Sequence, residues 1–93
     1  MATQSLIKQP GESRLYKMDF APLLAVGETI TSIASITSTP TGLTVSASAF
    51  DGVFAEARIS AGTDGVRYKL TFVVGTSASN ILESEGVLQV KNL

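Results

Sequence analysis

The sequence contains no cysteine, no histidine and no tryptophan. Without cysteine, neither a disulfide framework nor a thiolate metal site is possible. Without histidine, the chain lacks the most common general base and a common ligand of transition metals, so an enzyme would have to use carboxylates, lysine, serine or tyrosine. No grouping of those side chains indicates a reaction. We therefore expect a protein with no catalytic residues, no metal site and no cofactor.

Charged residues are also scarce: they make up 16% of the 93 residues and nearly cancel, to a net charge of −1. Such a chain has no broad positive field with which to bind nucleic acid, so nucleic acid is not an expected partner. No stretch approaches the roughly 20 apolar residues of a membrane span, and residues 1–8 lack the apolar run of a signal peptide. We expect a protein without a membrane partner that is made and retained in the cytoplasm.

Two acidic residues near the C-terminus, Glu83 and Glu85, form a pair without indicating catalysis. They lie two residues apart on an expected strand, so both side chains project from the same outward face. Arg67 and Lys69 project from the adjacent strand on that face, and cross-strand ion pairing explains the arrangement. A glycosidase would instead need two carboxylates that face each other across a cleft.

Alternation of apolar and polar residues is the strongest pattern that the sequence does contain. From Val66 to Val74 every second residue is large and apolar, the period that turns one face of a strand into a core. A second alternating run returns from Ile81, so the two runs predict a hairpin. Phe72 is expected to share the inward face with Ser84 and Gly86, which requires an odd number of residues in the loop.

From residue 14 onward, short alternating runs with turn residues between them predict six strands and no helix of normal length. Short strands at regular spacing are typical of a sandwich or a barrel. A chain of 93 residues supports one core, and a domain this small gains stability from neighbours that cover its surface. The strands are expected near Arg14–Phe20, Thr29–Thr37, Gly42–Ala49, Val53–Ser60, Val66–Gly75 and Ile81–Lys91.

Residues 1–12 show no sustained period and end soon after the turn pair Pro10-Gly11. We interpret them as an extended N-terminal arm, and residues 13–93 as a single sandwich domain. At about 3.3 Å per residue the extended arm could reach roughly 40 Å, far enough to cross a neighbouring subunit. The alternatives are a frayed terminus and a seventh strand. We expect the arm to contact another subunit rather than its own domain.

Alternation also predicts which residues of the two middle strands face the core. Ile30, Ile33 and Ile36 are spaced by three, which fits a helix, but the many Thr and Ser residues favour a strand. The Asp51-Gly52 pair then predicts a hairpin. The expected inward residues are Ile30, Ser32, Ala34 and Ile36 in the first strand and Leu43, Val45, Ala47 and Ala49 in the second, with Ile33 and Phe50 outward.

Several apolar residues are expected in the arm or at outward positions, where a free monomer would not need them. Scattered exposed apolar residues are normal, so ordinary surface is the alternative interpretation. The strongest pair flanks the Asp51-Gly52 turn, where two aromatic side chains would form a compact projection that fills a partner's pocket. The candidate partner-interface residues are Leu6, Ile7, Phe50, Phe54, Val73 and Val87.

Tyr68 lies just inside a strand, after the turn Gly62-Thr63-Asp64-Gly65. In this place it resembles the tyrosine corner of immunoglobulin-like sandwiches, whose hydroxyl bonds to backbone upstream, although a plain core tyrosine is the alternative. Further motifs are Lys17-Met18-Asp19-Phe20, Gly27-Glu28-Thr29-Ile30, Pro40-Thr41-Gly42-Leu43-Thr44-Val45 and the run from Ile59 to Tyr68. On these residues the chain resembles a family of small structural proteins of tailed bacteriophages that carry one immunoglobulin-like sandwich.

The resemblance implies an all-β, immunoglobulin-like β-sandwich of six to seven antiparallel strands. It also implies a non-enzymatic component of a bacteriophage virion, made in the host cytoplasm and present in several copies. This would be a capsid decoration or cement protein, or a head–tail accessory protein, with capsid or head–tail subunits as partners. The alternative is a carbohydrate-binding or adhesion module on the same fold. Sugar sites stack on exposed aromatic rings, and only Phe50 and Phe54 are candidates for that.

Overall fold

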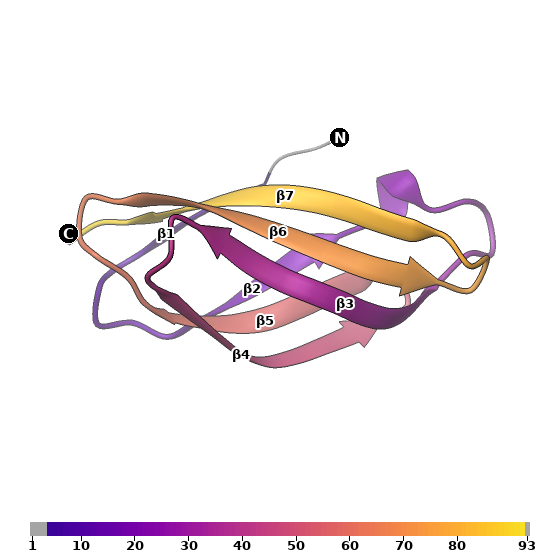
Figure 1. The fold of residues 1–93 in the computed structure, drawn as a ribbon, viewed down its shortest axis with the longest axis horizontal. Helices are drawn as coiled ribbons and strands as arrows, with labels where there is room; N and C mark the ends of the chain where they lie inside the picture. Colours follow the sequence, from indigo (N-terminus) through magenta and orange to yellow (C-terminus); the bar gives the residue numbers. More distant parts are fainter. Residues whose placement is uncertain (1–3, 93) are drawn as a thin grey trace.

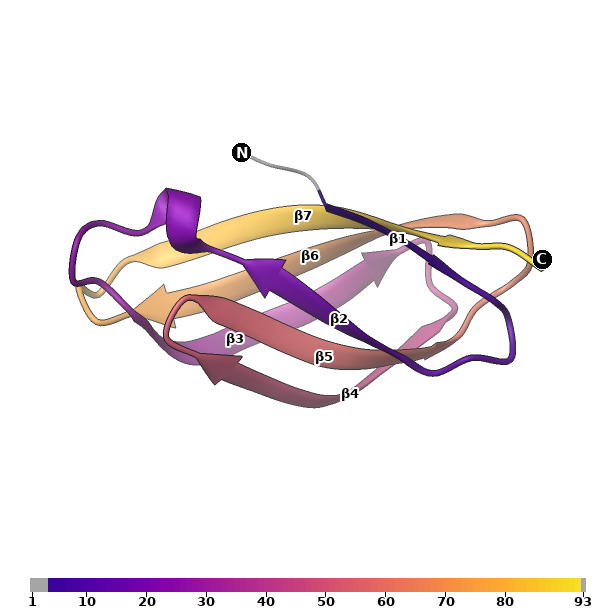
Figure 2. The ribbon, with the colours of Figure 1, turned by 180° about the vertical axis from the view of Figure 1, so that it is seen from behind.

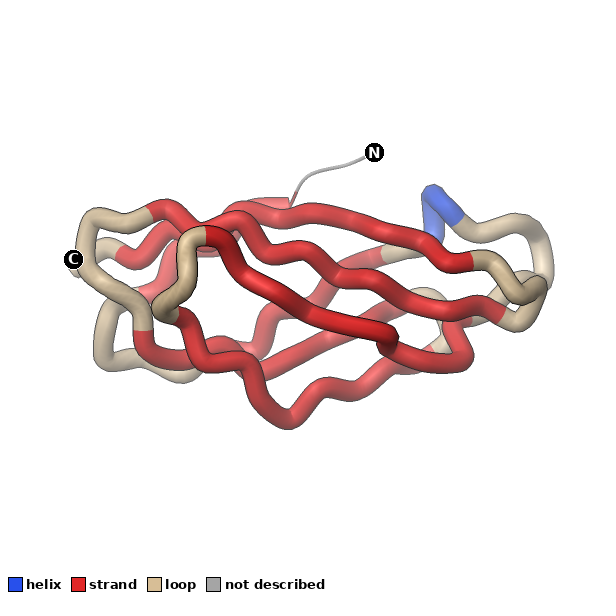
Figure 3. Tube along the Cα trace, in the orientation of Figure 1, coloured by secondary structure: helices blue, strands red, loops and turns tan. Residues whose placement is uncertain are grey.

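The computed structural model describes residues 4–92 and consists almost entirely of β-strands (Figures 1 and 3). Two sheets pack face to face, with the strand order β1-β7-β6-β3 in one and β2-β5-β4 in the other. The predicted all-β sandwich is confirmed. Met1–Thr3 and Leu93 lie outside the described residues. The strands are β1 (Gln4–Lys8), β2 (Arg14–Asp19), β3 (Ile30–Thr39), β4 (Leu43–Asp51), β5 (Phe54–Ala61), β6 (Arg67–Thr76) and β7 (Ile81–Val90), with a 3-10 turn η1 (Ala21–Leu23) after β2.

Side chains from alternate positions of both sheets fill the space between them. Tyr16 and Phe20 are buried on one side of the core, and the small Ala55 and Ala57 beside them leave room for large rings. The rings of Tyr16 and Phe72 stack across the two sheets with their centroids 5.9 Å apart. Burial raises the pKa of the Tyr16 phenol to about 12. Aromatic rings thus fill the space that the alanines leave open.

The β6–β7 hairpin has the facing that the alternation predicts. Phe72 lies opposite Ser84, and both residues are buried. The last registered pair, Gly75 and Ile81, encloses residues 76–80, which is five residues and therefore an odd number. The prediction is confirmed because neither strand contains a bulge that would interrupt the period of two.

Strand β3 carries two β-bulges that change which residues face the core. Its pairing with β6 skips one residue at Thr31 and another at Ala34. Each extra residue turns a spacing of two into a spacing of three, so Ile30, Ile33 and Ile36 all pack against the core. The strand prediction is confirmed, but the outward facing expected for Ile33 is wrong. The same shift leaves the expected inward residues Ser32 and Ala34 exposed.

One bulge in β4 has the same effect on Phe50. The pairing with β5 is shifted at Ala47 and Ser48, so every later residue of β4 faces the opposite side from the one that alternation predicts. Phe50 lies opposite the buried Ala55, on the inner face, and stays 44% exposed because β4 is an edge strand. The predictions that Phe50 faces outward and Ala49 inward are therefore wrong.

The expectation that the arm contacts another subunit is wrong for Gln4–Lys8. This segment is β1, which pairs in parallel with β7 of its own chain, so not all seven strands are antiparallel. Leu6 lies opposite the buried Leu88 and packs against the core. Lys8 is fully buried, and its Nζ donates to the carbonyl oxygen of Gln9 at 2.7 Å. Pairing within the chain buries Leu6 without the loss of translational freedom that binding another subunit entails.

Tyr68 makes the hydrogen bond that its position predicts. The backbone N–H of Thr63 donates to the Tyr68 hydroxyl oxygen at 3.0 Å, across the turn before β6. Gly42 packs against the same hydroxyl: a Cβ there would lie 3.0 Å from it, and a φ of +137° is a conformation that only glycine adopts readily. The tyrosine therefore holds together the turn before β6 and the turn before β4.

Candidate interaction surfaces

The packed interior leaves three kinds of surface for partners: the outer faces of the sheets, their edges, and the loops at the two ends of the sandwich. Within residues 4–92, no three His, Cys, Asp or Glu side chains come together as a metal site. In the same part of the chain, no helix is long and apolar enough to cross a membrane. What the described residues do offer is contact surface.

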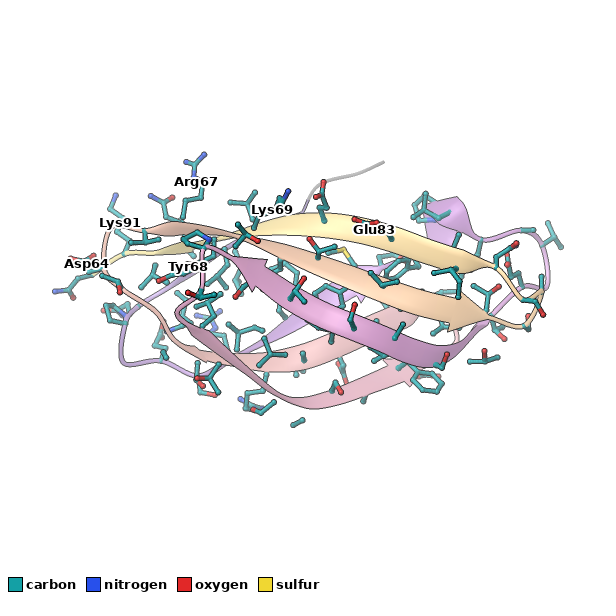
Figure 4. The ribbon with its side chains drawn as sticks, in the orientation of Figure 1. Asp64, Arg67, Tyr68, Lys69, Glu83 and Lys91 are labelled. Carbon is teal, nitrogen blue, oxygen red and sulfur yellow. The ribbon has the colours of Figure 1, made fainter. Side chains whose placement is uncertain are left out.

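The outer face of the four-stranded sheet holds three of the predicted interface residues. Val73 on β6 and Val87 on β7 are partly buried there, and Ile7 on β1 is 51% exposed. Lys69 lies opposite Val87, and its Nζ is 3.1 Å from a carboxylate oxygen of Glu85 (Lys69 is labelled in Figure 4). Both side chains of this ion pair are substantially exposed, so the pair contributes at most about 1 kcal/mol to stability. The face therefore combines apolar side chains with solvated charges.

Phe54 lies on the outer face of the three-stranded sheet, which Figure 2 shows in front. It stands opposite Asp51 and Asp19, away from the core, as expected. The ammonium of Lys17 lies 5.0 Å from the centroid of its ring, within the range of a cation–π interaction. Phe50 and Phe54 consequently project from opposite faces of the sheet and do not form one compact projection.

A hydrogen-bond network fixes the loop between η1 and β3. The backbone N–H of Ala25 donates to Glu28 Oε1 at 2.9 Å, and the Thr76 hydroxyl and the Asn80 amide both donate to Oε2. The bond from Ala25, followed by those from Thr76 and Asn80, holds the pKa of Glu28 below its usual value. Val26 stands in this loop with its side chain fully exposed. The loop is therefore tied to the β6–β7 hairpin while presenting an apolar side chain to solvent.

Sequence reasoning missed three exposed apolar residues: Leu15, Val26 and Ile81. Leu15 could have been found, because it precedes Tyr16 in a clean alternation and must share the outward face with Lys17. The exposure of Val26 could also have been predicted, because Val26 is a large apolar residue inside a turn, next to Gly27. Ile81 sits at the first position of β7, where facing is hardest to assign from a pattern.

The sandwich matches a known protein family over most of its length. Residues 8–89, from the end of β1 to near the end of β7, match the family described as podophage GP4 fiber-tail adaptor protein gp77. The chain belongs to this family. A search of curated proteins finds no match.

Membership of the podophage fiber-tail adaptor family settles the broad role of the chain. It is a structural protein of a tailed bacteriophage, and its partners are other virion proteins. The predicted virion location and the resemblance to structural proteins of tailed phages are both confirmed. The surfaces described above are therefore surfaces of a virion component.

Proposed function

We propose that this chain connects a tail fibre to the tail of a podophage virion. The observation that carries the proposal is the family match over residues 8–89, because the family description names a fiber-tail adaptor. The matched range contains β2 to β6 completely and most of β7, so the likeness extends over the sandwich apart from β1, of which only Lys8 is matched. The tail is the proposed attachment site, and a capsid decoration role draws no support from the match.

The two outer faces of the sandwich suit a protein that binds two partners at once. Ile7, Val73 and Val87 lie on the face of the four-stranded sheet, and Phe54 lies on the face of the three-stranded sheet. Because the two faces point in opposite directions, partners on them would not compete for space. The other two predicted interface residues, Leu6 and Phe50, face inward. We propose that they contribute indirectly, by packing beneath the strands that carry the outer surface.

The sandwich is further proposed to be immunoglobulin-like in detail. Support comes from the Thr63 N–H bond to the Tyr68 hydroxyl, which has the geometry of a tyrosine corner. Further support comes from the packing of a four-stranded sheet on a three-stranded one. A non-enzymatic role follows from the same proposal, because a connection between fibre and tail requires binding and no chemistry.

A carbohydrate-binding role has less support from the aromatic side chains. Sugar rings stack on exposed aromatic faces. Phe50 faces inward, and the Lys17 ammonium stands over one face of the Phe54 ring, so the described residues present no exposed aromatic pair for a sugar.

The proposal is tested by reconstitution with fibreless tails and the fibre protein of the same phage. Fibre is expected to sediment with tails when the purified chain is present, and mass spectrometry of the pellet is expected to show several copies of the chain per tail. Tails mixed with fibre alone are the control. Equal sedimentation of fibre with and without the chain would overturn the proposed function.

A further inference from the structure

A long stretch of the chain carries no charge at all. Between Glu28 and Asp51 lie residues 29–50, which is 22 residues without a single Asp, Glu, Lys or Arg. These residues form β3 and almost all of β4. All 15 charged residues, seven basic and eight acidic, lie elsewhere in the sequence. We refer to the open sides of β3 and β4 as the neutral edge.

Both strands of the neutral edge are the last strands of their sheets. β3 pairs only with β6, and β4 pairs only with β5, among the strands of residues 4–92. The two strands follow each other in sequence and run along the same margin of the sandwich (Figure 1). Backbone N–H and C=O groups on their open sides therefore have no strand to pair with, and such groups are a template for a further strand.

The margin formed by β2 is different, because it carries charge. Arg14, Lys17 and Asp19 lie along the six residues of that strand. Charged side chains on an edge strand discourage another strand from pairing, because their desolvation opposes it. The three-stranded sheet therefore has one edge that charge protects, at β2, and one that lacks this protection up to its last residue Asp51, at β4.

A recess lies between the two strands of the neutral edge. Its volume is about 420 Å³, and Ile33, Ile36 and Val45 line it beside Ser35, Ser46 and Ser48, whose polar atoms add to a mainly polar exposed lining. Small residues complete it, among them Ala34 of the second β3 bulge and Ala47 of the β4 bulge. A strand added beside β4 would turn alternate side chains towards the space between the sheets, where this recess can take a small uncharged one.

We propose that the neutral edge receives an extended, uncharged segment of a virion partner, which pairs with β4 as an additional strand and places a small uncharged side chain in the recess. This inference rests on the proposed adaptor function, because it assigns one of the two partners a binding site. A charged segment fits poorly, because residues 29–50 offer no opposite charge to compensate its desolvation. A second copy of this chain also fits poorly, because pairing β4 with its own copy would set one bulged strand against another.

The test uses two substitutions with the same cross-strand neighbour. Arg58 on the central strand β5 lies between Ser46 on β4 and Leu15 on β2. Ser46→Glu and Leu15→Glu both place a carboxylate beside this arginine, so both variants are expected to fold, which circular dichroism checks. Only Ser46→Glu puts the charge on the neutral edge. Binding of each variant to fibreless tails and to purified fibre protein is then measured separately by biolayer interferometry.

Ser46→Glu is expected to weaken binding to one of the two probes, the one that binds the neutral edge, by at least about tenfold. Leu15→Glu is expected to leave the binding of that same probe within about twofold of the wild type, whereas it is free to affect the other probe, because Leu15 shares the outer face with Phe54. Equal weakening of the same probe by both variants would overturn the proposal, because the outer face rather than the edge would then be the contact of that probe. Unchanged binding of Ser46→Glu would overturn it as well. If the wild type binds neither probe, the proposed function itself fails, which is a different result.

Hydrogen–deuterium exchange of the wild type provides a measurement that does not depend on any variant. Added strand pairing protects backbone N–H groups, so bound probe is expected to slow exchange within Leu43–Asp51 and not within Arg14–Asp19. Absence of that protection in a complex that does form would overturn strand addition. Sedimentation of the chain alone tests whether a second copy of the chain binds at the neutral edge. Self-association that Ser46→Glu abolishes would assign the edge to a second copy and overturn the proposal.

Discussion

Among single residues, Glu28 has the clearest consequence for stability. Its carboxylate accepts hydrogen bonds from Ala25, Thr76 and Asn80, and these bonds favour the ionised form. The pKa of Glu28 is therefore lower in the folded chain than its ordinary value of 4.5 in the unfolded chain. It follows that the carboxylate stabilises the fold fully above pH 4.5, and that this contribution is lost as the pH falls through the folded-state pKa.

We predict that Glu28→Gln lowers the melting temperature at pH 7 and flattens its decline as the pH falls below 4.5, compared with the wild type. Thermal unfolding followed by circular dichroism across this pH range measures both effects. Glu83→Gln removes an exposed carboxylate from β7 and is the control for net charge, so it should keep the steep wild-type profile. Parallel profiles for the wild type and Glu28→Gln would contradict the prediction.

The sequence predicted the role of Tyr68 but not that of Glu28 or Lys8. The bond of Tyr68 reaches a residue only five positions upstream, across a turn that the sequence itself displays. Glu28 instead binds residues 48 and 52 positions away, and nothing local to it points to them. Lys8 is buried because the parallel pairing of β1 places it opposite the buried Val90 of β7, so its burial could not be inferred before that pairing was known.

Among the elements, β1 gives a sharp comparison between two neighbouring residues. Leu6 packs against the core, whereas Ile7 is 51% exposed on the outer face. We predict that Leu6→Thr lowers the free energy of unfolding by about 1–3 kcal/mol, because it removes apolar contacts and buries a hydroxyl. Ile7→Thr keeps the branched side chain of a strand residue and should change the free energy of unfolding by less than about 0.5 kcal/mol.

Urea unfolding of the two variants measures this difference. Equal free energies of unfolding would mean that β1 does not pack against the core in solution. The free-arm interpretation would then be restored.

The elements that the sequence predicted well are those without bulges. In β6 and β7 a strict period of two gave the correct facing of Phe72 and Ser84. One extra residue inverts the facing of the residues that follow it. In β3 the same rule therefore failed between the two bulges and held again after the second, where Ile36 faces inward as expected, and in β4 it failed after the single bulge. The spacing of three between Ile30, Ile33 and Ile36 was the visible sign of the bulges in β3. Interpreted as a strand with extra residues, that spacing would have placed Ile33 correctly.

At the scale of the whole molecule, the outer face of the four-stranded sheet gives the third prediction. Val73 lies opposite Glu83 and Val87 opposite Lys69, so Val73→Lys combined with Val87→Glu pairs opposite charges and leaves the net charge unchanged. We predict that this double variant changes the free energy of unfolding by less than about 1 kcal/mol but weakens binding to fibreless tails or to fibre protein by about tenfold.

Urea unfolding and binding measured on the same preparation separate the two effects. Wild-type binding to both probes would show that this face is ordinary surface.

The broad role of the molecule could be inferred from sequence, whereas its contact surfaces could not be assigned residue by residue. The alternating strands predicted the β-fold, and the resemblance of the motifs to small structural proteins of tailed bacteriophages implied the structural role. A partner can contact only the apolar residues that face outward, and a bulge inverts the facing of the residues that follow it. Phe50 follows the bulge in β4, so its facing was predicted wrongly. Phe54 lies on β5, and its facing was predicted correctly. The alternation within one strand does not reveal where its pairing with the neighbouring strand skips a residue.

In the proposed adaptor role, the parallel pairing of β1 with β7 would have a mechanical consequence. The chain enters β1 at the end of the pairing where Gln4 meets Gly86, and it leaves β7 at the other end, where Lys8 meets Val90. A force that pulls these two ends of the chain apart is therefore directed along the strands, as shear. Shear loads the five registered positions together, whereas peeling would open them one after another. The shortest strand of the sandwich is thus placed where tension applied through the chain ends is shared along its whole length.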